Sequence, residues 1–252
     1  LTSAADAAGS TTFTYDAPGR VTEEARVTDG VSYATGYAYS GTTGDLVGMT
    51  YPTGLALTFQ RDAVGRISGV TAGGQTIAGN VAYLPFGPVE AMDLGAVSVT
   101  RSHDARYQVT GIQAGTALNY TYTRDGMGNI TGLGGAPKPP FASGTTDYAY
   151  TANRLVSSTG AEPAAFTYDN AGNITSDGAR DFVYNQNNRL VRVEAGGTVL
   201  AEYAYDGFER RVKKVAGGVT VHYHYDLNGR LIAETDGAGN PIRDYVYIDG
   251  EP

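Results

Sequence analysis

The chain has 252 residues, a formal net charge of −8, 19 tyrosines, 35 glycines and no cysteine. The absence of cysteine excludes disulfide and thiolate chemistry, and an acidic chain lacks the basic face that nucleic acid phosphates require. Charged residues make up 17% of the chain, too few for a helical bundle, and no run of about 20 apolar residues could span a membrane. We therefore expect an ordered chain whose core is rich in aromatic rings.

A short phrase recurs along the chain. It consists of two aromatic or aliphatic residues two apart, a polar turn, then Gly followed by Arg or Asn and an aliphatic residue. In chain order, the clear copies are Phe13–Val21, Leu57–Ile67, Tyr120–Ile130, Phe166–Ile174 and Tyr223–Leu231, with looser copies at Tyr148–Leu155, Phe182–Leu190 and Tyr203–Val212 and a partial copy at Tyr245–Tyr247. The steps are unequal and average roughly 20 residues, which favours hairpins of unequal length over a solenoid of fixed period.

Each phrase predicts a strand, a tight turn and a second strand. Aromatic residues two apart lie on the same face of a strand. Asp followed three residues later by Gly is typical of a type I turn closed by a glycine with positive φ. We expect the turns at Asp16, Gly19, Arg20, Asp62, Gly65, Arg66, Asp125, Gly128, Asn129, Asp169, Gly172, Asn173, Asp226, Gly229 and Arg230. We expect an aromatic ladder, with rings of neighbouring hairpins side by side, at Tyr15, Tyr39, Tyr122, Tyr150, Tyr168, Tyr184, Tyr205, Tyr225 and Tyr247.

These units predict an all-β fold, an array of antiparallel hairpins in a long curved sheet. Residues 1–252 are expected to form a single array that is a fragment of a longer chain. Two stretches depart from the phrase: 71–115, expected to be irregular, and 133–146, a Gly- and Pro-rich stretch expected to be a loop.

Units such as Tyr225–Leu231, repeated at this spacing, resemble the RHS or YD repeats of bacterial Rhs toxins, wall-associated proteins, Tc toxin BC components and animal teneurins. The resemblance is strong over 147–252 and good over 11–70 and 116–133. It implies that the repeats form one continuous sheet that spirals into a hollow shell, part of which this chain would supply. In the bacterial toxins of the family, such a shell encloses a variable C-terminal toxin domain.

The resemblance implies a structural function. We expect a wall segment of a secreted or cell-surface bacterial shell, with flanking repeats and an enclosed C-terminal effector domain as partners, and no enzyme activity. The family's self-cleavage motif, Asp-Pro-x-Gly, is not in this sequence, because Asp249 precedes Gly250 and not proline. We therefore assign no catalytic residue. The alternative is a cell-surface carbohydrate-binding or adhesion module in which exposed tyrosines stack on glycans.

Some residues could form a metal or enzyme site, but each such set also has a simpler structural explanation. His222 and His224 share a strand face, and with Asp226 they make a three-ligand metal site conceivable, but they also replace rings in an ordinary repeat. The turn aspartates could bind calcium, but they also cap their own loops, with an Arg four residues later placed to pair with them. Glu23 and Glu24 point to opposite faces and make a poor pair for glycoside hydrolysis. We expect no metal and no cofactor.

Overall fold

The computed structural model describes residues 1–136, 146–160 and 163–248. Within these ranges the chain consists of β-strands joined by short turns, and no helix is present there. It follows that the described residues contain no helix with the length and hydropathy needed to cross a bilayer. The predicted fold class, all-β with antiparallel hairpins, is confirmed.

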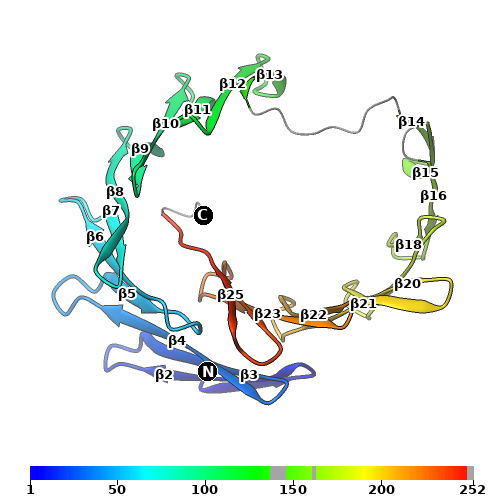
Figure 1. The fold of residues 1–252 in the computed structure, drawn as a ribbon, viewed down its shortest axis with the longest axis horizontal. Coiled ribbons are helices and arrows are strands. Elements are labelled where there is room, and N and C mark those ends of the chain that lie inside the picture. The colour runs from blue at the N-terminus through cyan, green and yellow to red at the C-terminus, as the bar shows by residue number, and fades with distance from the viewer. Residues whose placement is uncertain (137–145, 161–162, 249–252) are drawn as a thin grey trace. The chain divides into compact units, whose positions relative to one another are not determined.

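The described strands form three hydrogen-bonded sheets in which each strand pairs with the next one in sequence (Figure 1). The first sheet contains β1 (Ser3–Asp6), β2 (Gly9–Tyr15), β3 (Val21–Thr28), β4 (Val31–Tyr39), β5 (Leu46–Thr50), β6 (Ala56–Arg61), β7 (Ile67–Ala72), β8 (Gln75–Tyr83), β9 (Val89–Leu94), β10 (Val97–His103), β11 (Val109–Ala114), β12 (Leu118–Arg124) and β13 (Ile130–Ala136). The second contains β14 (Thr146–Thr151), β15 (Arg154–Gly160) and β16 (Ala164–Ala165). The third contains β17 (Thr167–Tyr168), β18 (Ile174–Ser176), β19 (Asp181–Tyr184), β20 (Leu190–Ala195), β21 (Thr198–Tyr205), β22 (Arg211–Ala216), β23 (Val219–Tyr225), β24 (Leu231–Asp236) and β25 (Pro241–Asp244).

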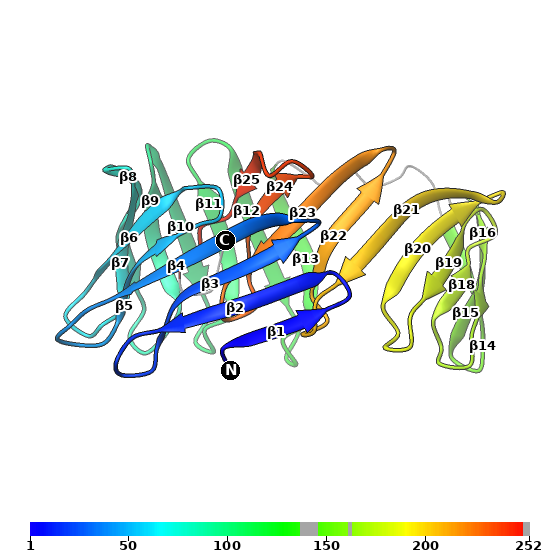
Figure 2. The ribbon, with the colours of Figure 1, turned by 90° about the horizontal axis from the view of Figure 1, so that it is seen from below.

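This up-and-down order gives the first sheet two chemically different edges, by which we mean the two sides along which the strands end and the turns lie. The turns after β2, β6 and β12 begin with Asp16, Asp62 and Asp125 and lie at one edge of the first sheet. At the opposite edge the chain turns mainly on glycine, as at Gly73–Gly74 after β7. The third sheet also has turns at both ends of β19–β23 (Figure 2); its predicted turns at Asp169 and Asp226 share one edge, while Asp177 and Asp236 begin turns at the other. All the predicted Asp turns of one sheet therefore lie along the same edge.

The chain divides into two compact units. Unit 1 comprises Leu1–Ala34 and Phe141–Asp244, and unit 2 comprises Thr35–Pro140 and Tyr245–Pro252. The single array over 1–252 remains a prediction, because the order of strands within each sheet does not decide how many domains the chain forms.

Strand alternation places one face of each hairpin in a core. In β6, Leu57 and Phe59 are buried while Ala56 and Thr58 are exposed, as a period of two requires. The core of unit 2 is built from Tyr37, Met49, Tyr51, Leu57, Phe59, Val70, Ala78, Val89, Met92, Val99 and Ile248. The hydroxyl of Tyr51 donates to the carbonyl oxygen of Tyr245 at 2.9 Å, which attaches the C-terminal segment of the unit to its strands. The core is therefore part aromatic and part aliphatic.

Unit 1 has a core that mixes apolar and polar side chains. Val212, Ile232 and Ala233 are at most 1% exposed, and Tyr33 and Tyr223 are buried beside them. His222 and Thr235 have no exposed surface at all. Buried polar groups are costly unless they are hydrogen-bonded, so their partners decide what this core can do.

Residues 71–115, expected to be irregular, contain β8, β9, β10 and β11. The turn backbone is kept although its residues change: the N–H groups of Leu84 and Asp104 donate to the carbonyls of Pro88 and Gln108, four residues later. The phrase is therefore lost from the sequence while the hairpin remains. In the expected loop at 133–146, residues up to 136 belong to β13 and Thr146 begins β14; residues 137–145 lie outside the described residues.

Candidate functional site: the repeat turn, the tyrosine ladder and the histidine cluster

The five predicted turns share one backbone pattern. They begin at Asp16, Asp62, Asp125, Asp169 and Asp226. In each, the Asp N–H donates to the carbonyl of the residue four later at 2.8–3.0 Å, and the glycine N–H donates to the Asp carbonyl at 2.9–3.2 Å. The strand register shifts at the residue before each Asp, and φ lies between 77 and 92° at Gly19, Gly65, Gly128, Gly172 and Gly229. This is a tight turn followed by a glycine bulge.

The turn aspartate closes its own loop through both carboxylate oxygens. One oxygen accepts from the backbone N–H four residues later at 2.8–2.9 Å. The other accepts at 2.7–2.9 Å from the side chain of that same residue, which is Arg20, Arg66, Asn129, Asn173 or Arg230. In the two turns with asparagine, the side-chain amide holds the pKa of Asp125 and Asp169 below its usual value. The carboxylate is thus occupied within the turn.

The glycine of the turn leads to a paired prediction. Nothing lies within 4 Å of a Cβ built on Gly65, so Gly65→Ala costs only the strain of an L-residue at φ 88°, and we expect it to lower the free energy of unfolding by about 1 kcal/mol. Glu209 occupies the equivalent position with φ 63°. Glu209→Gly relieves this strain and is expected to raise the free energy of unfolding by about 0.5–1 kcal/mol. Loss of the exposed ion pair between Glu209 and Arg189 reduces this gain slightly. Urea denaturation measures the change in the free energy of unfolding for both variants. Changes of the same sign would contradict the conclusion that this turn position favours glycine.

The ladder tyrosines bond mainly to backbone rather than to one another. The hydroxyls of Tyr168, Tyr205 and Tyr225 donate to carbonyls at or near the start of a neighbouring strand, those of Leu155, Leu190 and Arg211, at 2.6–2.8 Å. Tyr15 bonds in the same way to Leu1, and Tyr83, which the sequence did not single out, to Ile67. Each tyrosine thereby joins two strands by side chain as well as by backbone.

The other ladder positions vary. Tyr39 ends β4, Tyr184 ends β19 with its pKa raised by burial, and Tyr247 follows β25. Tyr150 is 65% exposed, and Tyr122 contacts Tyr120 of its own strand, with ring centroids 6.5 Å apart. In three repeats the ring partner from the adjacent hairpin is a guanidinium: Arg66 lies over Tyr83 at 4.5 Å, Arg154 over Tyr168 at 5.4 Å and Arg210 over Tyr225 at 5.1 Å. Arg66 and Arg210 therefore bind the Asp of their own turn and also contact a ring of the next hairpin.

Two arginines take the place of ladder tyrosines. Arg61 and Arg124 directly precede the turn aspartates Asp62 and Asp125, where other copies have tyrosine. The guanidinium of Arg61 donates to the carbonyl of Leu46 at 2.9 Å, and that of Arg124 to the carbonyl of Val109 at 3.0 Å. Both carbonyls belong to the first residue of a neighbouring strand, as in the tyrosine copies. Sequence analysis missed these residues, although their position before the Asp was a usable signal.

A further set of polar side chains, the histidine cluster, lies within unit 1 and consists of Asp29, Tyr33, Lys213, His222, His224 and Thr235. The Nδ1 atom of His222 is 2.7 Å from the Tyr33 hydroxyl, and its Nε2 is 3.2 Å from a carboxylate oxygen of Asp29. Because a carboxylate only accepts, Nε2–H donates to Asp29, while Nδ1 shares a hydrogen bond with the Tyr33 hydroxyl. Lys213 neutralises Asp29 at 2.6 Å.

His224 completes this buried network. Its Nε2 lies 2.9 Å from the hydroxyl oxygen of Thr235, and its ring is 4.2 Å from that of Tyr33, centroid to centroid. Burial, reinforced by the nearby His222 and Arg26, lowers the pKa of His224 to about 4. His224 is therefore neutral near pH 7, and a proton on it is strongly disfavoured in the folded chain.

The cluster joins strands that are far apart in sequence. Asp29 and Tyr33 belong to the β3–β4 hairpin, and His222 and His224 belong to β23. Unit 1 has a second such connection: the Asp6 carboxylate pairs with Arg26 at 3.0 Å and accepts from the backbone N–H of Gly207 at 3.2 Å. Both sets of contacts hold the first hairpins of the chain against the third sheet.

Neither histidine is placed for metal or substrate chemistry. His222 has no exposed surface, and Asp226, weighed as a third ligand, is bound to Arg230 in its turn. In the described ranges no three His, Asp or Glu side chains are arranged to hold a metal ion. The arrangement can fasten strands together, and it offers no open nucleophile or base.

Comparison with known proteins gives relatives at the levels of sequence and fold. The family model described as Teneurin YD-shell matches residues 138–251. The tRNA nuclease WapA of Bacillus subtilis (strain 168) is 31% identical over 142 residues, and the tRNA3(Ser)-specific nuclease WapA of Bacillus spizizenii is 30% identical over 142. Each match covers 54% of this chain and 6% of the relative, so the chain spans a small part of those proteins.

Two solved structures share the fold. A chain of the Photorhabdus luminescens Tc holotoxin pore matches with a TM-score of 0.57 and 15% identity, over 96% of this chain and 20% of that one. A chain of the TcdB2-TccC3-Cdc42 crystal structure matches with a TM-score of 0.58 and 15% identity, over 92% of this chain and 17% of that one. The YD-shell match over residues 138–251 and the WapA relatives support an RHS/YD-repeat family for this part of the chain, and the solved structures share its fold.

Proposed function

We propose that the chain is a section of wall in a secreted RHS shell, and that the shell encloses and protects a C-terminal toxin or effector domain of the same polypeptide. The observation that carries this proposal is the repeated fastening of strand to strand. Turn aspartates, ladder hydroxyls and guanidinium groups are engaged within the wall itself. A surface whose polar groups are already bound to one another suits a structural wall better than an enzyme active site.

The names of the relatives are consistent with a polypeptide in which the wall and the toxic activity belong to different parts. Two WapA proteins are named as tRNA nucleases, while this chain corresponds to 6% of their length. In our proposal, any toxic activity belongs to a part of the polypeptide outside the wall. The secreted or cell-surface bacterial location, and the partnership with flanking repeats, belong to the same proposal. Strands β1 and β25 each have one side that pairs with no other described strand, and a flanking repeat could pair there.

Protease access tests enclosure directly. A site for a specific protease is inserted at Gly73–Gly74, a turn with open space around both residues, in the polypeptide that carries this chain and its C-terminal neighbour. After the cut, the neighbour is expected to be digested faster by thermolysin than in the intact protein. A second variant, Asp226→Ala, loosens the wall without a cut. The uncut polypeptide treated with both proteases is the control. Equal digestion in intact, cut and Asp226→Ala proteins would refute enclosure.

A further inference from the structure

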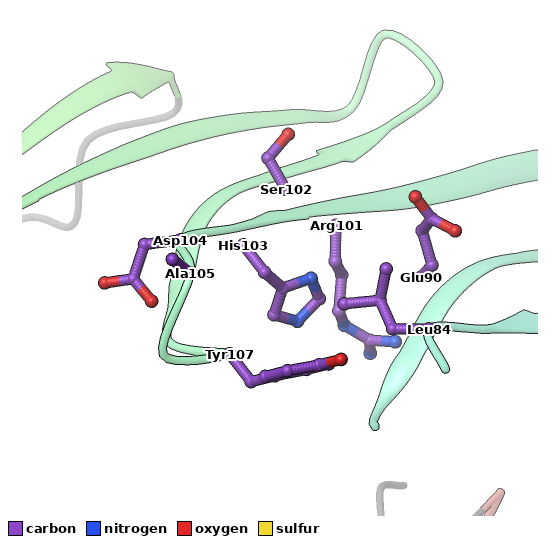
Figure 3. A pocket seen from close by; sticks show the side chains of 8 residues that line it. All are labelled: Leu84, Glu90, Arg101, Ser102, His103, Asp104, Ala105 and Tyr107. Atoms are coloured by element: carbon purple, nitrogen blue, oxygen red, sulfur yellow. The ribbon is translucent and has the colours of Figure 1, made fainter. Parts of the chain in front are cut away.

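A pocket of about 520 Å³ lies in unit 2, at the edge of the first sheet where the Asp turns gather (Figure 3). It is formed by side chains of the turns that follow β8 and β10 and by residues of β9 and β10. Its volume is within the range of small-molecule sites, about 300–1,000 Å³. Apart from Leu84 and Asp104, which begin the two turns, none of its lining residues is among the turn, ladder or histidine-cluster residues described above, so it requires its own explanation.

Two residues of the pocket depart from the repeat. His103 stands directly before the turn residue Asp104, where other copies have tyrosine or arginine. Tyr107 stands at the glycine position with φ 61°. Such strain in a residue other than glycine persists only where its surroundings hold it, and it is common at binding sites. The repeat has therefore been altered at the two positions that shape this pocket.

The chain holds the Tyr107 ring in place as one wall. Its hydroxyl donates to the carbonyl of Pro85 at 2.7 Å, and a Cβ on Gly87 would lie 2.4 Å from the ring, so only glycine leaves room there. The residue is still 45% exposed. Figure 3 shows the ring lying flat beneath His103, with Arg101 and Leu84 close by. A half-exposed ring fixed in this way offers a flat apolar face to a ligand.

His103 lacks partners of its own. Within the described residues, neither of its buried ring nitrogens has a hydrogen-bond partner. A neutral imidazole has one donor and one acceptor, and leaving both unmade is unfavourable. A hydroxyl group, which both donates and accepts, can satisfy either nitrogen.

Two carboxylates and one guanidinium line the pocket, so it disfavours an added anion. Arg101 and Glu90 line it with opposite charges, and the Asp104 carboxylate already accepts from the backbone N–H groups of Arg106 at 2.8 Å and Gln108 at 2.9 Å. A phosphate would face Glu90, and a cation would face Arg101. In the part of the chain that the structure describes, no metal-binding group of three His, Asp or Glu occurs. The lining thus favours a neutral ligand with many hydroxyls and one apolar face.

We propose that this pocket binds a neutral pyranose unit of a saccharide. The C–H face of the sugar ring packs on Tyr107, and its hydroxyls bond to His103, Arg101 and Glu90. The site is local to unit 2, so it holds whether or not the wall encloses a cargo domain, and it gives the carbohydrate-binding alternative one defined position.

Binding is measured on the full chain by calorimetric titration with neutral oligosaccharides (cello-, malto-, xylo- and chito-series), with trigalacturonate and inorganic phosphate as charged probes. At least one neutral series is expected to bind, and the charged probes are not. Tyr107→Gly removes the ring while restoring the glycine of the repeat, so it relieves strain instead of unfolding the turn. We expect it to weaken binding by about tenfold or more, a difference of about 1.4 kcal/mol.

Matched variants separate binding from folding. Tyr107→Phe keeps the ring but loses its bond to Pro85, so it is expected to bind more tightly than Tyr107→Gly and no better than the unaltered chain, while His103→Ala is expected to bind more weakly than the unaltered chain. Glu209→Gly makes the same backbone change in a turn of unit 1 and should leave affinity unchanged. The proposal is overturned if no neutral saccharide binds at millimolar concentration, if phosphate or trigalacturonate binds better, or if Tyr107→Gly binds as well as the unaltered chain.

Discussion

Replacing Asp226 by alanine is expected to lower the free energy of unfolding by about 3 kcal/mol. The residue is 2% exposed, and its carboxylate accepts from the backbone N–H groups of Asn228 and Arg230 and pairs with the Arg230 guanidinium at 2.6 Å. Alanine leaves these donors without an acceptor, and breaking a buried pair on one side costs about 3–5 kcal/mol. The lower end applies because the Arg230 side chain is 33% exposed. Urea denaturation followed by circular dichroism measures the change.

Asp125→Ala is the matched control, because Asp125 makes the same loop contacts at an exposed turn with Asn129 in place of arginine. There we expect a loss of about 1 kcal/mol, since water can replace the acceptor. Equal losses at the two sites would show that the buried ion pair adds nothing to the turn.

Acidification from pH 6.5 to 4 is expected to lower the free energy of unfolding by up to about 3 kcal/mol through His224 alone. Burial lowers its pKa from 6.5 to about 4 in the folded chain, so the unfolded chain takes up the proton first. The stabilisation is complete above pH 6.5 and is lost as the pH falls towards the folded pKa, at 1.36 kcal/mol for each unit between the two values. Denaturation at half-unit steps of pH measures the slope.

His224→Gln isolates this contribution, because glutamine keeps a hydrogen-bonding group beside Thr235 but does not titrate. The slope between pH 6.5 and 4 should flatten in the variant. Two other kinds of group also change the stability on acidification. The pKa of turn aspartates such as Asp125 is lowered in the folded chain, so their protonation destabilises it only below about pH 4. Burial raises the pKa of Glu24, so its protonation stabilises the folded chain and opposes the loss of stability caused by His224. An unchanged slope in His224→Gln would show that His224 is not the group responsible.

The turns could be predicted from sequence because their interactions are local. Asp226, Gly229 and Arg230 lie within five residues, so the spacing alone places the carboxylate against the N–H and guanidinium it binds. The placement of the ladder rings on one strand face could also be predicted, because it depends only on residues two apart in the sequence. The target of each ladder hydroxyl could not, because it depends on which carbonyl the register brings beside the ring, as for Tyr205 and Leu190.

The contacts of the histidine cluster could not be predicted from the sequence, for a different reason. His222 and Asp29 are 193 residues apart, and nothing in the sequence near either residue indicates the other. The repeats within 71–115 look irregular in the sequence because Tyr107 and Phe86 replace the expected turn residues while the backbone keeps the turn, with positive φ at both. A pattern of residue types cannot reveal a backbone conformation that a residue adopts under strain.

The two unlike ends of the strands in the first sheet limit how that sheet can grow or shrink during evolution. Gain or loss of a single strand would send every later Asp turn to the opposite edge and would reverse the direction of every later strand. Gain or loss of a strand pair leaves both edges as they were. Genes of this kind should therefore change length by duplication or deletion of whole two-strand modules, each carrying one Asp turn and one glycine turn.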